Sequence, residues 1–142
     1  MPDKIFLDTN ILVYLANEDS PFHLRSVEKF KEVAGKSELW ISRQVLREYA
    51  VVMTRPGIVE KPLSSKEVAS DIEKWESIFQ VADETEEVTG ILVKLIKAHD
   101  IKGKKIHDAN IVAAMMANSI QTLFTLNVDD FKKFKKIQLI AI

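Results

Sequence analysis

Short apolar segments alternate with longer helical patterns along this chain, and no other feature of the sequence restricts its fold as strongly. The segments between the short runs carry apolar residues at helical spacing. Strands separated by helices are typical of a parallel sheet covered by helices on both faces. We therefore expect an α/β fold, a three-layer α/β/α sandwich around a short parallel sheet of four or five strands. The predicted strands are 4–7, 39–41, 79–82, 123–125 and 138–142.

Local signals mark where several of the predicted helices begin. Ser20 and Pro21 resemble an N-cap followed by a proline in the first turn. Ser42 opens the helix after the second strand, and Ser64 with Glu67 has the spacing of a capping box. The other helices are expected at 10–17, 84–99, 106–118 and 128–134.

Composition excludes several classes of protein and of site. With 142 residues and few glycines or prolines, the chain is expected to form one domain, 1–142. It has no cysteine, which excludes disulfides, thiolate metal sites and cysteine nucleophiles. The net charge of −1 gives no support to a binder that holds nucleic acid through bulk charge. We find no pattern of a signal peptide or a membrane span, so a cytoplasmic location is expected.

Polar and acidic residues follow the predicted strands or open the helices behind them. Asp8 comes directly after the first strand, and Thr125 and Asn127 stand at the end of a later one. Glu48 lies in the helix after the second strand, and Asp108 opens the helix after a glycine–lysine turn. Ligands of open parallel sheets bind beyond the carboxyl ends of the strands. These segments are therefore expected to converge on one edge of the sheet.

Carboxylates brought together repel one another unless a cation compensates their charge. A site that has only oxygen ligands suits Mg²⁺ or Mn²⁺ better than structural zinc. Such ions support the hydrolysis of phosphodiesters by water, without a covalent intermediate. The acids thus indicate a metal-dependent hydrolase.

Each acid also has an ordinary structural explanation. Asp8 and Asp108 could cap the helices that follow them, and Asp129 and Asp130 could serve a short helix in the same way. Glu48 could be a solvated helix residue, as most helical glutamates are. Spacing alone leaves these alternatives open.

Basic residues near the expected site are candidates for holding the backbone of an RNA strand. They are Arg43 and Arg47 on the Glu48 helix, and Lys105 before Asp108. Lysines also recur within 132–136. Runs of this kind are usually solvated surfaces. The chain has no Walker loop, GxGxxG or GxSxG motif.

Taken together, four segments resemble the PIN-domain nucleases, and within them the VapC-like toxins of prokaryotic type II toxin–antitoxin pairs. They are IFLDTNILVY at 5–14, SRQVLREY at 42–49, IHDANIVAA at 106–114 and LFTLNVDDF at 123–131. The segments occur in the family's order and span nearly the whole chain.

This resemblance implies a PIN-like fold, dependence on Mg²⁺ or Mn²⁺, and endonucleolytic cleavage of RNA. It carries the roles of catalytic residues and metal ligands to Asp8, Glu48 and Asp108. It also implies a cognate antitoxin as partner and a homodimer. A catalytically weak PIN module that acts by binding RNA or protein is the alternative.

The chain departs from the family at the fourth acidic position. Many members have an acid where this chain has Asn127, whose carbonyl oxygen can bind a cation but brings no charge. Asp130 is the next candidate for a fourth catalytic acid, followed by Asp129. Thr125 and Thr9 are expected to orient ligands or to bind weakly. A second metal ion is therefore in question.

Overall fold

The computed structural model describes residues 2–142, so only Met1 of the predicted domain lies outside the described residues. It contains a five-stranded parallel sheet in the order β3-β2-β1-β4-β5. The α/β prediction and the parallel sheet are confirmed. The strands are β1 (Lys4–Leu7), β2 (Glu38–Ser42), β3 (Gln80–Ala82), β4 (Thr122–Phe124) and β5 (Gln138–Ile140).

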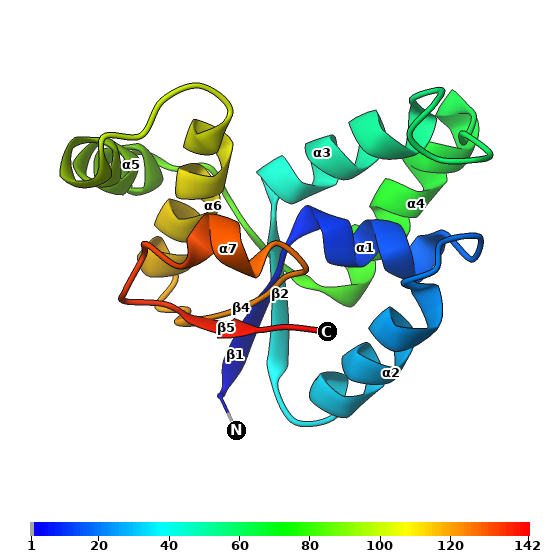
Figure 1. Cartoon of the computed structure of the whole chain (residues 1–142), viewed down its shortest axis with the longest axis horizontal. Helices are drawn as coiled ribbons and strands as arrows, with labels where there is room; N and C mark the ends of the chain where they lie inside the picture. Colours follow the sequence, from blue (N-terminus) through cyan, green and yellow to red (C-terminus); the bar gives the residue numbers. More distant parts are fainter. Residues whose placement is uncertain (1) are drawn as a thin grey trace.

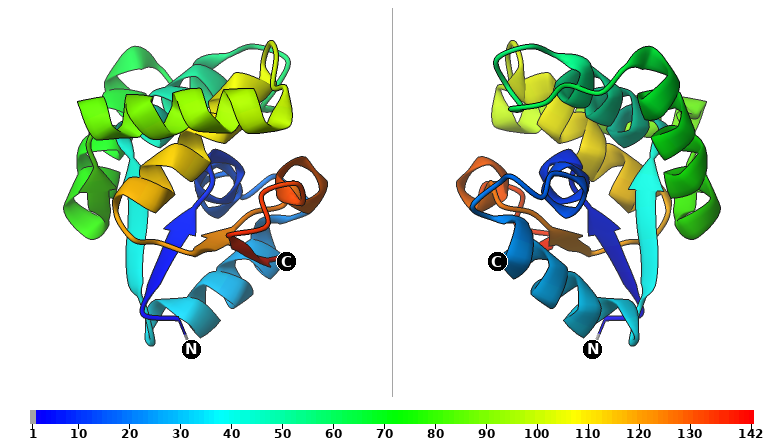
Figure 2. Two further views of the ribbon diagram at one scale, coloured as in Figure 1. Left: turned by 90° about the vertical axis from the view of Figure 1, so that its left-hand side faces the viewer. Right: turned by 90° about the vertical axis from the view of Figure 1, so that its right-hand side faces the viewer.

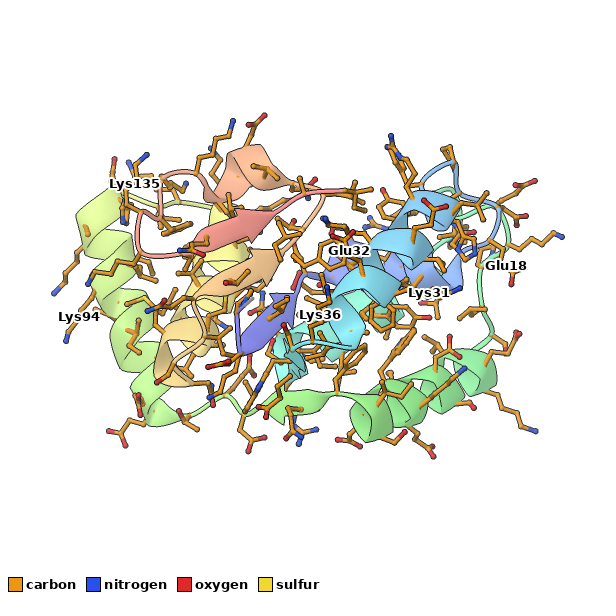
Figure 3. The ribbon with its side chains drawn as sticks, turned by 90° about the horizontal axis from the view of Figure 1, so that it is seen from below. Glu18, Lys31, Glu32, Lys36, Lys94 and Lys135 are labelled. Atoms are coloured by element: carbon orange, nitrogen blue, oxygen red, sulfur yellow. The ribbon has the colours of Figure 1, made fainter. Side chains whose placement is uncertain are left out.

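Helices cover both faces of this sheet. Figure 1 shows α5 and α6 on one side and α1, α2 and α4 on the other, and the view from below in Figure 3 shows the strands between the two groups. The strands β1 and β4 are buried almost throughout, which explains their apolar runs. The helices are α1 (Thr9–Ala16), α2 (His23–Ala34), α3 (Arg43–Thr54), α4 (Ser65–Ile78), α5 (Glu86–His99), α6 (Lys105–Ala117) and α7 (Val128–Phe131).

Two of the predicted caps are present and one was wrong. Ser42 caps α3, and Ser64 forms a complete capping box with Glu67 at the start of α4. Ser20 does not cap α2, which begins at His23 without a side-chain cap. The Ser20 hydroxyl instead accepts a hydrogen bond from the main-chain N–H of Phe22 at 3.1 Å. Ser20 therefore stabilises a tight turn that precedes α2 and does not cap the helix.

The core is built on the neighbouring inner strands β1 and β4. Ile5, Phe6 and Leu7 of β1 have no exposed surface, and neither do Leu123 and Phe124 of β4. The strands β1 and β4 are neighbours, although more than a hundred residues separate them in the chain. The order of connections reverses between them, and the carboxyl ends of strands at such a point are the usual place for a ligand site.

The carboxyl end of the sheet is also where two helices begin. In Figure 1, α1 starts at the upper end of β1 and α3 at the upper end of β2, while Figure 2 shows α2 toward the opposite end of the strands.

None of the helices within residues 2–142 has both the length and the apolar character needed to cross a membrane.

Candidate functional site

A cavity of about 290 Å³ lies beyond the carboxyl ends of β1 and β4. Asp8, Glu48 and Asp108 all line it, and so does Asn127. These side chains come from the start of α1, from α3, from the first turns of α6 and from the segment after β4. The structure thus brings the three predicted acids into one cavity.

Asp8 is both a helix cap and a wall of this cavity. Its Oδ1 accepts a hydrogen bond from the N–H of Thr9 at 2.8 Å, and its Oδ2 accepts one from the Thr125 hydroxyl at 2.8 Å. Asn10 Nδ2 lies 3.4 Å from the same Oδ2. Burial raises the pKa of Asp8 to about 6, although the hydrogen bonds from Thr125 and Thr9 oppose the shift. Asp8 therefore caps α1, as its structural explanation predicted, and it lines the candidate site at the same time.

Glu48 is half-buried on α3 and faces the cavity rather than bulk water. Gln44 donates a hydrogen bond from Nε2 to Glu48 Oε1 at 3.0 Å, and the Thr9 hydroxyl donates to the same oxygen at 3.5 Å. Burial raises the pKa of Glu48 above its usual value, and the Gln44 hydrogen bond opposes this. Both hydrogen bonds end on Oε1, so they fix the orientation of the Glu48 carboxylate.

Asp108 lies in the first turn of α6 but does not cap it. The cap position is Lys104, which makes no side-chain capping bond, so the capping interpretation of Asp108 was wrong. Burial raises the pKa of Asp108 to about 6, and repulsion from Asp130 and Glu48 adds to the shift. Lys133 acts in the opposite direction. Asp108 therefore lies close to two other carboxylates, and the positive charge of Lys133 offsets part of their repulsion.

The fourth position is divided between two residues. Asn127 lines the cavity, whereas Asp129 and Asp130 both line an adjoining shallow pocket. Asp130 is nevertheless close enough to Asp108 for its negative charge to raise the pKa of Asp108. Asp129 is exposed and forms an ion pair with Lys132 at 2.6 Å. Of the two consecutive acids, Asp130 is the one associated with the site.

The chemistry of these donors fits a hard divalent cation. Three carboxylates and the amide oxygen of Asn127 are oxygen ligands, and Mg²⁺ and Mn²⁺ prefer such ligands. Within residues 2–142, however, no three His, Cys, Asp or Glu side chains are gathered closely enough to hold an ion as they stand. Mg²⁺ is commonly bound by one or two carboxylates and keeps several water ligands, so the donors present still suit it.

Both arginines considered for RNA binding are already paired with carboxylates. Arg43 forms ion pairs with Glu76 and with Asp83, the latter at 3.0 Å, and Arg47 pairs with Glu84 at 3.0 Å. All five side chains are substantially exposed, so these pairs are weak and can exchange. An RNA role for the arginines stays a prediction that requires these pairs to open.

The lysines are placed differently. Lys105 is exposed at the first position of α6, and Lys133 lies near enough to Asp108 to lower its pKa. Figure 3 shows Lys94 on α5 and Lys135 on the same flank of the molecule. Among the lysines of 132–136, Lys133 is thus the one with an electrostatic effect on the candidate site.

Sequence reasoning missed three amides that organise the acids. Asn10 lies beside Asp8 and Thr125, with Nδ2 3.4 Å from each, and its Oδ1 accepts from the N–H of Leu126 at 3.3 Å. Gln44 and Asn110 form a second group next to Glu48. Gln44 precedes Glu48 by four residues, a spacing that places both on one side of a helix and could have revealed this contact.

The chain matches a family model described as PIN domain over residues 5–137. Among curated proteins it is similar to Ribonuclease VapC24 of Mycobacterium tuberculosis, with 25% identity over 134 residues that cover 90% of this chain and 89% of that protein.

Two solved structures illustrate the similarity of fold. VapC20 of M. tuberculosis, described as a Sarcin-Ricin loop cleaving toxin, superposes with a TM-score of 0.71 at 18% identity, over 97% of this chain and 99% of that one. VapBC2 from Rickettsia felis, bound to a DNA fragment from its promoter, gives a TM-score of 0.70 at 22% identity and covers 98% of both chains.

Proposed function

We propose that this chain, which belongs to the PIN domain family, is a Mg²⁺- or Mn²⁺-dependent endoribonuclease that hydrolyses RNA phosphodiester bonds. One observation carries the proposal: Asp8, Glu48 and Asp108, from three distant parts of the sequence, line a single cavity at the carboxyl edge of the sheet. The name ribonuclease of the curated relative supports the choice of reaction.

In this proposal Asp8, Glu48 and Asp108 hold the cation. When bound, the ion supplies Lewis-acid chemistry that stabilises the negative charge developing on the phosphodiester. Thr125 and the N–H of Thr9 orient the two oxygens of Asp8. Without a cation, the charge of the three acids would repel a phosphate, so substrate and cation are expected to bind together.

The neutral fourth position limits how many ions the site can hold. Asn127 offers a carbonyl oxygen without charge, and Asp130 lies in the adjoining pocket. We expect one ion to bind firmly and a second one only weakly.

We further propose that the protein acts as the toxin of a toxin–antitoxin pair in the cytoplasm, as a homodimer that a cognate antitoxin inhibits. The similarity to proteins named VapC, one of them described as a toxin, supports this role. A small gene directly upstream that encodes a DNA-binding protein would support it further. Purification of the two gene products as one complex would test the partnership.

A second function is a PIN module that binds RNA or protein with little catalysis. Two observations favour it: Asn127 is neutral, and within residues 2–142 no three acids are gathered tightly enough for an ion. Such a module would bind its partner without any metal site that depends on Asp8.

Calorimetric titration of the metal-free protein with Mn²⁺ separates the two functions. The nuclease is expected to show a saturable site that Asp8→Asn removes. Asp129→Asn is the matched control, because Asp129 is exposed and does not line the cavity, and it is expected to bind like the wild type. A wild-type protein without an Asp8-dependent site would contradict the metal-dependent nuclease and favour the binding module.

A further inference from the structure

Gln44 is a buried amide whose two donors and whose oxygen are all paired inside the molecule. Its residue is 4% exposed, and it lies one helical turn before Glu48 on α3. It is not among the residues that line the cavity. A buried polar side chain is stable only when its donors and acceptors are paired.

Three hydrogen bonds satisfy this amide. Nε2 donates to Glu48 Oε1 at 3.0 Å and to the main-chain carbonyl of His107 at 2.8 Å. Oε1 accepts from Asn110 Nδ2 at 2.7 Å. The reversed amide would turn its oxygen toward a carboxylate and a carbonyl, so these partners leave one orientation.

These contacts connect the two helices that carry acids of the site. Glu48 belongs to α3, whereas His107 and Asn110 lie on either side of Asp108 in α6. The main packing partners are α1 and α4 for α3, and α5 for α6. Because α3 and α6 share little direct packing, Gln44 is a principal link between them.

We infer that Gln44 is a positioning residue, which holds Glu48 and the start of α6 in register so that the Glu48 and Asp108 carboxylates face one cavity. The inference rests on the proposed function, in which both acids bind the cation. The Gln44 amide and the Thr9 hydroxyl both donate to Glu48 Oε1. Oε2 is therefore the Glu48 oxygen that we expect to bind the cation. Asn110 acts one step further away, by holding Gln44.

The test compares Gln44→Met with the wild type. Methionine has a similar length but neither donor, so the bridge is lost while the volume is kept. Loss of a residue that orients metal ligands typically weakens metal binding 10- to 100-fold. We therefore expect a Mn²⁺ dissociation constant about tenfold higher by calorimetry. In RNA cleavage at saturating Mn²⁺ we expect a lower kcat with an unchanged KM, because Gln44 does not line the cavity.

Ser26→Ala controls for loss of stability alone. Ser26 is fully buried on α2 and donates a hydrogen bond to the Phe22 carbonyl at 2.7 Å, away from the cavity. It is expected to lower the melting temperature while Mn²⁺ affinity stays at the wild-type value. If Gln44→Met behaves like Ser26→Ala, with reduced stability and unchanged Mn²⁺ affinity, the positioning role is overturned and the proposed function stands.

A double variant tests whether Asn110 acts through Gln44. Asn110→Leu alone is expected to weaken Mn²⁺ binding less than Gln44→Met, and the combined variant is expected to be no worse than Gln44→Met. Fully additive losses would contradict the proposed order of contacts. A wild-type protein that binds no Mn²⁺ through Asp8 would instead contradict the proposed function, and the positioning role with it.

Discussion

Asp8 shows at the scale of one residue that a buried charge in the candidate site lowers the stability of the folded protein. Its carboxylate caps α1, yet it is 6% exposed and shares the cavity with two further acids. Hydrogen bonds from Thr9 and Thr125 compensate only part of the cost of burial, because the pKa of Asp8 is still raised to about 6. The ionised site is thus less stable than a neutral one would be.

This conflict predicts how stability depends on pH in the metal-free protein. The pKa of Asp8 is about 6 in the folded state against 3.8 for its ordinary value, so the folded state binds the proton more tightly. The contribution of Asp8 to stability is therefore complete below about pH 4, falls as the pH rises toward 6, and stays low above it. Asp108, with a pKa also raised to about 6, acts in the same window.

Asp8→Asn removes this titration and keeps a good capping residue. We expect it to stabilise the metal-free protein at pH 7 by about 1–3 kcal/mol, since each pKa unit corresponds to about 1.4 kcal/mol. Thermal unfolding in EDTA between pH 4 and pH 8 measures the difference between the variant and the wild type. A difference that does not grow between pH 4 and pH 6, or a variant less stable than the wild type at pH 7, would disagree with this account.

The sequence allowed the three acids to be predicted, but not the amides that hold them. Asp8 and Asp108 stand at positions defined by the chain itself, next to the end of a strand and the start of a helix. The contact of Gln44 with Asn110 depends on how α3 and α6 approach each other, which no local pattern specifies. Ser20 was misjudged because a serine before a helix can equally well close a turn.

At the scale of elements, the turn before α6 determines where Asp108 is placed. Gly103 has φ of +63° in this turn, a backbone conformation that side chains with a Cβ disfavour. Lys104 and α6 follow directly, so this turn sets the direction in which the helix starts.

Two Gly→Ala substitutions are therefore expected to have opposite effects. Gly103→Ala should destabilise the protein by about 1 kcal/mol, because the left-handed conformation is unfavourable for alanine even though no atom lies within 4 Å of the new Cβ. Gly90→Ala, inside α5 and equally free of contacts, should stabilise it by about 0.5–1 kcal/mol.

Chemical denaturation of both variants measures these changes in the free energy of unfolding. Destabilisation by Gly90→Ala together with a neutral Gly103→Ala would show that the turn and the helix differ from this structure.

Most elements were predicted within a few residues of their observed bounds, because their periodicity is strong. The differences in the short elements are these: α7 ends at Phe131 rather than near 134, β5 ends at Ile140 rather than 142, β3 begins at Gln80 rather than 79, and β4 is displaced by one residue as a whole. Short elements depend on tertiary hydrogen bonds. Thr125, for example, follows β4 but still donates from its N–H to the Ile140 carbonyl at 3.1 Å.

At the scale of the whole molecule, the strand order explains why distant acids meet. With β1 beside β4, Asp8 and Thr125 become neighbours and form a hydrogen bond. The other two acids come from helices on either side of this pair, Glu48 from α3 and Asp108 from α6. The sequence predicted a parallel sheet and convergence at one edge. The order of the strands follows from packing over the whole chain and could not be derived from local patterns.

The central claim is that these acids form the site of a metal-dependent ribonuclease. Its most direct test is cleavage of a labelled single-stranded RNA by nuclease-free, EDTA-treated protein to which Mg²⁺ or Mn²⁺ is added back. We expect the wild type and Asp129→Asn to cleave only with the metal, and Asp108→Asn to fall to background while keeping its fold by circular dichroism. Undiminished metal-dependent cleavage by folded Asp108→Asn would contradict the claim.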